Sequence, residues 1–294
     1  MAYFYGTSYN DAVVPGFLSS GVEAKTPGTT PSSAADNIFG YEGNDILDGG
    51  GGDDVISGGY GSDKLYGADG NDTLRGNYGN NLMYGGAGDD KMYGEAGNDT
   101  FYGYGGNDQM YGGAGQDAFT GANGHDLFYG GTEGDWFFGG GGNDTVYGEG
   151  GNDRISTLSG NDKLYGGADN DTLSSSAGTD MMYGGSGHDS LTSYTGDDLL
   201  DGGAGTDDMR AGPGNDIYDF NAVSETTSGT NRDTVWFEYA GTRLGDVIDL
   251  SGMDADTTIP GNQAFEFRGI GSLAVAYSVV PGSSISSVCA VSEA

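Results

Sequence analysis

A nine-residue repeat runs through the middle of the chain. Starting at Asp36 and stepping by nine, one register continues to Asp216 without an insertion or a deletion. It holds 21 positions, of which all but Asn81 are Asp. The aspartates are Asp36, Asp45, Asp54, Asp63, Asp72, Asp90, Asp99, Asp108, Asp117, Asp126, Asp135, Asp144, Asp153, Asp162, Asp171, Asp180, Asp189, Asp198, Asp207 and Asp216. A fixed period of this kind predicts a repeat fold, in which each unit buries its hydrophobic face only by stacking on its neighbours.

The residues around each Asp predict a strand and a turn. An apolar residue stands two places after every register position, from Ile38 to Tyr218. The triplet around it predicts a short strand whose central side chain points inward while its neighbours point outward. Glycines before the Asp permit the positive φ of a tight turn. Two nonapeptides then make one coil of 18 residues, so Asp residues 18 apart stack on one edge of an all-β, parallel solenoid.

Composition sets a condition on this fold. The chain of 294 residues has 61 Gly, a net charge of −34 and only 10 Lys+Arg against 44 Asp+Glu. Low hydrophobicity with high net charge is typical of disorder, and like charges repel in a compact state. The acidic balance argues against nucleic acid or an anionic membrane surface as partners, because both require basic patches. The periodic order nevertheless predicts a folded chain. Such a fold requires a cation that cancels the negative charge.

The turns offer oxygen ligands for such a cation. Asp supplies a hard anionic oxygen and the turn supplies carbonyl oxygens, which is the ligand type that calcium prefers. Edges of 11 and 10 loops leave at most 19 gaps between loops, and the 20 aspartates are the candidate metal ligands. Filling about 17 gaps with divalent cations would cancel the net charge, so we expect folding to depend on metal binding. EF-hands are excluded, because no helical flanks or bidentate Glu occur at the required spacing.

The pattern GGxGxDxUx, with U apolar, resembles the hemolysin-type RTX repeat. GGAGDD (85–90) and GGGGND (139–144) carry the resemblance, which covers about residues 34–219. It implies a right-handed parallel β-roll with calcium bound in its turns. It also implies export through type I secretion machinery and a secreted, extracellular or cell-surface protein of a Gram-negative bacterium.

Some loops depart from the pattern. The loops before Asp162, Asp180 and Asp198 contain TLSGND, SSAGTD and SYTGDD and have lost the paired glycines. All three belong to one edge, so we expect weaker or absent calcium sites there between about residues 157 and 198. Asn81 keeps a carbonyl oxygen but loses the charge, and GGTEGD (130–135) displaces a glycine by one place. We expect weaker sites in these two loops as well.

Tyrosines form a second pattern on the predicted outer surface. They are spaced 18 apart at Tyr93, Tyr111, Tyr129, Tyr147, Tyr165 and Tyr183. One interpretation is a docking surface for another copy of the chain or for a partner. The other is that stacked aromatic rings simply suit a β-sheet face. An ice-binding face would need a regular row of Thr, which Thr73, Thr100, Thr145 and Thr172 do not form.

The ends predict caps. We expect residues 1–35 to form an N-terminal cap and linker, 36–219 the β-roll, and 220–294 a C-terminal β cap with a secretion-signal region. Near the N-terminus, Asp11 and Val13 look like one further repeat, and 15–34 is predicted to be a loop. DVIDLSGMDADTTIPGNQAFEFRG (246–269) resembles the C-terminal domain of serralysin-type metalloproteases, which implies further calcium ligands at Asp249, Asp254 and Asp256. The last residues, SSVCAVSEA, depart from the acidic and aliphatic export signal of that family.

No catalytic motif is apparent. A serralysin protease needs H-E-x-x-H, whereas the only histidines, His125 and His188, each precede a repeat Asp. The sequence also lacks a G-x-S-x-G elbow, C-x-x-C and a P-loop, and the lone Cys289 excludes an intrachain disulfide. No Sec-type signal peptide is apparent at the N-terminus, and Met1 favours a complete chain.

The favoured function is therefore a non-catalytic, calcium-binding extracellular component that is structural, adhesive or self-assembling, without a membrane span. The alternative is an accessory calcium-binding and secretion module of an extracellular enzyme, such as a protease or a polysaccharide-modifying enzyme. A calcium-tuned lectin, with sugar contacts at exposed aromatics such as Trp136, is a third possibility.

Overall fold

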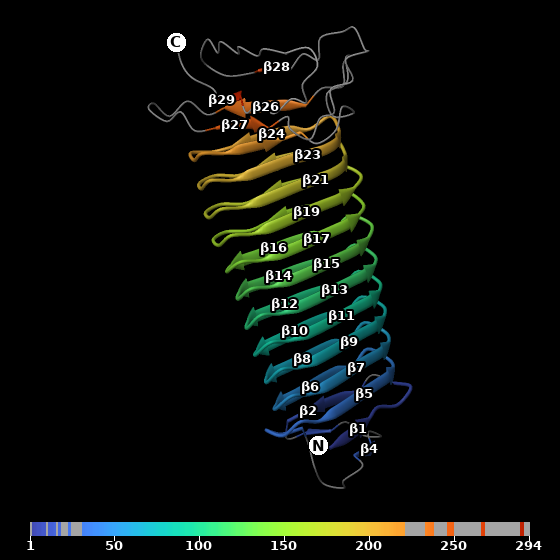
Figure 1. Ribbon diagram of the computed structural model, residues 1–294. Helices are drawn as coiled ribbons and strands as arrows, with labels where there is room; N and C mark the ends of the chain where they lie inside the picture. Colours follow the sequence, from blue (N-terminus) through green and yellow to red (C-terminus); the bar gives the residue numbers. More distant parts are fainter. Residues whose placement is uncertain are drawn as a thin grey trace, which may run out of the picture. The chain divides into compact units, whose positions relative to one another are not determined.

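The computed structural model of the chain consists of strands and turns. It describes residues 2–9, 11–15, 17–18, 23–24, 31–220, 233–237, 246–249, 266–267 and 289–290. The chain divides into two units, Met1–Gly150 and Gly151–Ala294, here called the N-terminal unit and the C-terminal unit. Each unit is a parallel β-solenoid, in which strands from successive coils lie side by side (Figure 1). No helix long and apolar enough to cross a bilayer occurs among the described residues.

In the N-terminal unit, every coil contributes one strand to each of two parallel sheets. Partner residues lie 18 apart, as in the pair Phe101 and Phe119. One sheet contains β5 (Asn37–Glu42), β7 (Val55–Tyr60), β9 (Thr73–Tyr78), β11 (Lys91–Ala96), β13 (Gln109–Ala114), β15 (Leu127–Thr132) and β17 (Thr145–Gly150). The other contains β6 (Ile46–Gly51), β8 (Lys64–Asp69), β10 (Leu82–Ala87), β12 (Thr100–Gly105), β14 (Ala118–Asn123) and β16 (Trp136–Gly141). The predicted coil of 18 residues is confirmed.

The C-terminal unit repeats this arrangement with unequal strands. One sheet contains β19 (Lys163–Ala168), β21 (Met181–Gly187), β23 (Leu199–Gly205), β25 (Ile217–Asp219), β27 (Val247–Asp249) and β29 (Cys289–Ala290). The other contains β18 (Arg154–Ser156), β20 (Thr172–Ser174), β22 (Ser190–Thr192), β24 (Asp208–Ala211), β26 (Thr234–Phe237) and β28 (Glu266–Phe267). The strands β18, β20 and β22 have 3 residues each, whereas β19 has 6. These three short strands lead into the loops that have lost their paired glycines.

The interior of each unit is a row of the predicted apolar side chains. All 21 are buried, because the alternation of a strand points the second residue after each register position inward. Phe119 stacks between Phe101 and Phe137, with ring centroids 4.7 and 4.6 Å apart, and meets Phe128 edge-on at 6.0 Å. The next inward residue along a regular strand is a glycine, as Gly112 follows Met110, which leaves room beside the turn.

The N-terminal residues add a further coil to their unit. Strand β1 (Tyr3–Tyr5) pairs in parallel with β5, and β2 (Ala12–Val14) pairs in parallel with β6. Phe4 and Val13 are fully buried, which confirms the inward position predicted for Val13. The predicted loop 15–34 contains two strands, β3 (Phe17–Leu18) and β4 (Glu23–Ala24), which pair antiparallel to β2 and β1. They cover strand edges that would otherwise be open to pairing with another chain.

The coils also continue past the end of the periodic sequence. Strands β26, within DTVWFEY (233–239), and β27, within DVIDL (246–250), pair in parallel with β24 and β25. Val235 and Ile248 are 4% and 5% exposed and extend the apolar row. Within the described residues, these two strands therefore continue the parallel pairing of the solenoid.

Candidate metal-binding turns

The turn before most repeat Asp residues has one backbone shape, which the loops before Asp162, Asp180, Asp198 and Asp216 do not share. In the loop that ends at Asp90, Gly86 and Gly88 have φ of 118° and 125°. These left-handed positions lie four and two residues before the Asp, and glycine adopts them without steric cost. Glu133 takes the second of them with φ of 70°, so the GGTEGD loop keeps the regular turn despite its displaced glycine.

The aspartates 18 apart stack on one edge through a fixed hydrogen bond. The backbone N–H of Asp72 donates to Oδ1 of Asp90 at 2.8 Å, and Asp90 N–H donates to Oδ1 of Asp108 at 2.9 Å. The same bond links the C-terminal unit, as from Asp171 N–H to Oδ1 of Asp189 at 2.8 Å. The predicted stacking is confirmed. Each bond uses one carboxylate oxygen, Oδ1, and fixes the direction of the other, Oδ2.

The second oxygen, Oδ2, is buried where no protein group donates to it. Among the described residues this holds for eleven aspartates, each at most 2% exposed. They are Asp45, Asp54, Asp63, Asp72, Asp90, Asp108, Asp117, Asp126, Asp171, Asp189 and Asp216. A buried carboxylate oxygen without a donor is strongly destabilising unless a cation or a proton neutralises it.

Except at Asp216, where Ala211 stands five residues before the Asp, these oxygens converge on a small space beside a glycine, which we call the glycine cradle. A β-carbon on Gly67 would meet Asp72 Oδ2 and would lie 2.6 Å from the carbonyl oxygen of Gly85, one coil further on. Gly121 faces Asp126 and the carbonyl oxygen of Gly139 in the same way. No three His, Cys, Asp or Glu side chains gather at one point among the described residues. A metal ion here would therefore bind single carboxylates together with backbone carbonyls, and this all-oxygen set fits calcium.

Burial makes these carboxylates hard to ionise without a cation. It raises the pKa of Asp90 from 3.8 to about 8, and the neighbouring carboxylates of Asp108 and Asp72 add to the rise. Burial likewise raises the pKa of Asp126 and of Asp171 to about 7. The backbone N–H on Oδ1 lowers each pKa only in part. At neutral pH the calcium-free turn thus holds carboxylates that favour a proton.

This raised pKa predicts a pH response of the calcium-free chain. A group whose pKa is raised by folding stabilises the fold below its unfolded pKa and loses that contribution as pH rises through the folded pKa. In protein freed of calcium by gel filtration, the β-sheet circular-dichroism signal should grow as pH falls from 8.5 to 5, with a midpoint between about 6 and 8. With saturating calcium the signal should stay constant. A calcium-free signal that falls or stays flat on acidification would contradict the raised pKa values.

The three loops without paired glycines have a different shape. Leu158, Ser176 and Tyr194 stand at the first left-handed position and do not have positive φ. Thr157, Ser175 and Ser193 stand where a regular loop has its cradle glycine, and all three are buried. The structure thus distinguishes these loops from the regular turns, as the sequence predicted. Their metal content stays a prediction.

Two aspartates outside the nonapeptide register extend its edges. Asp207 N–H donates to Oδ1 of Asp233 at 2.8 Å, and Asp216 N–H donates to Oδ1 of Asp246 at 3.2 Å. At the other end, Asp11 N–H donates to Oδ1 of Asp45 at 2.6 Å. The repeat pattern predicts Asp11 but not Asp233 or Asp246. The sequence feature that could have identified them is the Asp-x-apolar triplet, which occurs as DTV at 233–235 and as DVI at 246–248. Insertions displace both triplets from the period of nine.

The remaining C-terminal candidates cannot be placed. Asp254 and Asp256 lie outside the described residues, and of Asp249 only the backbone, in β27, is described. Most of the segment 246–269 that resembles the serralysin C-terminal domain likewise lies outside the described residues.

Comparison with known proteins identifies the repeat. The profile of the RTX calcium-binding nonapeptide repeat (4 copies) matches residues 32–65, 57–92, 66–101, 84–119, 120–155, 147–182, 156–191 and 183–218. No curated protein matches the chain. A solved structure, a hyperactive, Ca²⁺-dependent, β-helical antifreeze protein from an Antarctic bacterium, is similar with a TM-score of 0.51 and 17% identity, over 78% of this chain and 85% of that one. At this identity the likeness supports the fold alone. The profile covers more than half of the chain, which therefore belongs to the RTX calcium-binding nonapeptide repeat family.

Proposed function

We propose that this calcium-binding β-roll is a secreted, non-catalytic protein that folds when it binds calcium outside the cell and then acts as a structural, adhesive or self-assembling component. The buried Oδ2 atoms carry the proposal, because they make the compact state costly wherever calcium is scarce. The net charge of −34 acts in the same direction, since self-repulsion favours an extended chain until cations bind.

The two histidines support a non-catalytic role. His125 Nδ1 accepts a hydrogen bond from Asn143 N–H at 2.7 Å, and His188 Nδ1 accepts one from Thr206 N–H at 3.2 Å. Asn98 and Asn107 make the equivalent bond in other loops, to the N–H of Gln116 and of His125. Both histidines therefore act as turn residues, each joining a loop to the next loop of its edge.

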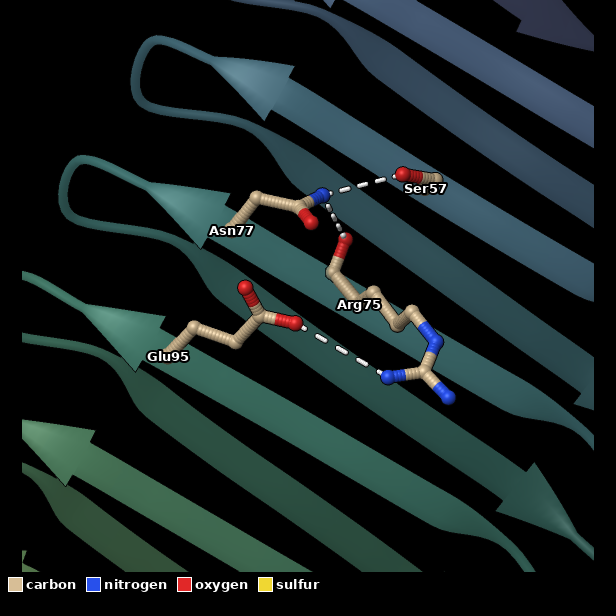
Figure 2. Close-up of polar contacts among 4 residues, drawn as sticks. All are labelled: Ser57, Arg75, Asn77 and Glu95. Atoms are coloured by element: carbon tan, nitrogen blue, oxygen red, sulfur yellow. Dashed lines mark hydrogen bonds and ion pairs between the residues drawn. The ribbon is translucent and has the colours of Figure 1, made fainter.

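The tyrosine column of the N-terminal unit is the proposed assembly surface. Tyr93, Tyr111, Tyr129 and Tyr147 stack on successive strands with centroid distances of 4.9, 5.1 and 4.9 Å. Arg75 covers the ring of Tyr93 at 4.4 Å and pairs with Glu95 at 3.8 Å. Figure 2 shows this ion pair, beside Asn77, which bonds to Ser57 across the strands. Because the ring faces cover one another, a second copy would meet ring edges and hydroxyl groups.

Light scattering tests this assembly. Calcium should raise the scattering of the parent chain, and Tyr111→Ser with Tyr129→Ser should remove most of that rise while leaving the circular-dichroism spectrum unchanged. The matched control is Tyr84→Ser with Tyr102→Ser, which removes two stacked tyrosines, 5.1 Å apart, from the other sheet. Equal scattering from both double variants would reject the tyrosine column as the assembly surface, and a calcium-folded parent that never associates would reject self-assembly.

Two alternative functions can be weighed against this proposal. The accessory-module alternative rests on the serralysin-like segment 246–269, and a catalytic domain on the same secreted polypeptide would establish it. The antifreeze activity named for the similar structure would require a regular Thr row. One register column of the N-terminal unit instead holds Thr73, Lys91, Gln109, Leu127 and Thr145.

A further inference from the structure

One loop of the regular type holds an amide where the others hold a carboxylate. Asn81 Nδ2 lies in its glycine cradle, where a β-carbon on Gly76 would meet it, and donates to the carbonyl oxygen of Gly79 at 3.1 Å. Burial raises the pKa of Asp99, one coil further on, to about 6, and hydrogen bonds from the backbone and side chain of Asn81 lower it in part. The amide therefore places a donor, bonded to the carbonyl oxygen of Gly79, where a regular loop has the carboxylate oxygen Oδ2.

A second kind of donor occupies the cradle in the C-terminal unit. Ser193 Oγ donates a hydrogen bond to Oδ2 of Asp198, and both side chains are buried, at 1% and 2% exposure. Ser175 has the equivalent place five residues before Asp180. Burial raises the pKa of Asp180. Among the described residues the hydroxyls of Ser175 and Thr157, unlike that of Ser193, make no hydrogen bond. Thr157 is the buried residue at this place before Asp162. In the regular loops the same place holds glycine.

The backbone of these loops keeps the bridge to the neighbouring coil that the regular turns also have, as between Asp69 and Ala87. Ala177 N–H donates to the carbonyl oxygen of Leu158 at 2.8 Å, and Thr195 N–H donates to that of Ser176 at 2.9 Å. The acceptors are the residues that have lost the first left-handed conformation of the regular turn. The bridge is therefore common to both kinds of loop, which differ in the φ of its acceptor residue and in the side chain that occupies the cradle.

We infer that Asn81 and Ser193 occupy the place of the cation, so that their two loops close without calcium. This inference rests on the proposed calcium-dependent folding of the regular loops. It adds a rule that decides occupancy loop by loop. A glycine cradle facing an Asp takes calcium, whereas a cradle filled by an amide or a hydroxyl side chain does not. A neutral donor satisfies the buried acceptor locally, and the loop then gains nothing from added metal.

The first test adds a ligand to the one regular loop that lacks it. The full-length chain is dialysed to equilibrium against radioactive calcium, and the bound ions are counted per chain. Asn81→Asp should bind about one ion more than the parent, since Gly76, Asn77 and Gly79 already provide the cradle and the regular turn. The control is Asn80→Asp, which makes the same charge change at the adjacent, exposed position and should leave the count unchanged.

The second test concerns the hydroxyl. Ser193→Ala keeps the β-carbon in the cradle but removes the donor to Asp198, so the calcium count should stay constant while the urea midpoint falls. Ser193→Gly combined with Tyr194→Gly clears the cradle and permits the left-handed turn, so this variant should bind about one additional ion.

The outcomes separate the inference from the function on which it rests. A parent chain that binds no calcium would overturn the proposed calcium-dependent folding. A parent that binds calcium, with Asn81→Asp giving the same count as the parent or no more than Asn80→Asp, would overturn the inference alone. Ser193→Ala with an unchanged urea midpoint would show that the hydroxyl does not replace the cation.

Discussion

Removal of calcium from the full-length chain at pH 8 should reduce its β-sheet circular-dichroism signal to that of an unfolded chain, and calcium should restore it. Eleven aspartates bury an oxygen without a donor. Leaving one buried polar group unsatisfied costs roughly 1–3 kcal/mol, and more for a charged group. A typical domain is stable by only about 5–15 kcal/mol. The uncompensated carboxylates therefore outweigh the stability that such a fold has available, and the fold should depend on the ion.

Magnesium provides the control for this prediction. It demands near-ideal octahedral geometry, keeps several of its waters and is smaller than calcium, so it should not fit a cradle made of fixed carboxylate and carbonyl oxygens. Magnesium at the same ionic strength should leave most of the signal unrecovered. Full recovery with magnesium, or with monovalent salt alone, would mean that screening of the net charge is sufficient. A spectrum that is unchanged by chelator would contradict calcium-dependent folding altogether.

Phe119→Ala should lower the stability of the calcium-saturated chain by about 3–5 kcal/mol, the usual cost of truncating a buried Phe. The Phe119 side chain is 2% exposed and touches three other rings. A narrow coil has few neighbouring side chains that could move into the space left by the ring, so little of this cost should be recovered. Urea unfolding followed by circular dichroism measures the loss.

Trp136→Ala is the matched control for Phe119→Ala. Trp136 belongs to the neighbouring strand β16, but its side chain is 61% exposed. Its truncation should change the stability by no more than about 0.5 kcal/mol, as is usual for surface positions. Similar losses for the two variants would contradict the assignment of the inward and outward positions.

The repeat makes most of the roll predictable from sequence. The period of nine defines both the strand and the turn, so the inward position of Phe119 and the stacking of Asp72 on Asp90 follow from counting along the chain. The end coils were harder to predict. Phe4 has no Asp two residues before it, and Asp233 and Asp246 follow insertions that interrupt the register. Their spatial partners identify them as parts of further coils. Phe4 lies on β1, which pairs with β5, and the N–H groups of Asp207 and Asp216 donate to Asp233 and Asp246.

The chemistry of the exceptional loops needed the structure. The sequence showed that Ser193 replaces a glycine and that Asn81 replaces an Asp. It did not show that these two side chains, from different places in the nonapeptide, reach the same kind of space beside a turn. That follows from the hydrogen bonds that the preceding coil donates to Oδ1 of Asn81 and of Asp198, since they set the direction of Nδ2 in one residue and of Oδ2 in the other. A repeat position therefore predicts where a residue lies, but its donor or acceptor role depends on the coil next to it.

The position of calcium itself is the most direct test. Crystals grown with calcium, and diffraction data collected at a wavelength where calcium scatters anomalously, would locate each ion independently of the protein coordinates. We expect an anomalous peak in the cradles beside Gly67 and Gly121, within roughly 2.3–2.6 Å of Oδ2 of Asp72 and of Asp126. Crystals of the folded roll with no anomalous peak at these two cradles would contradict the account.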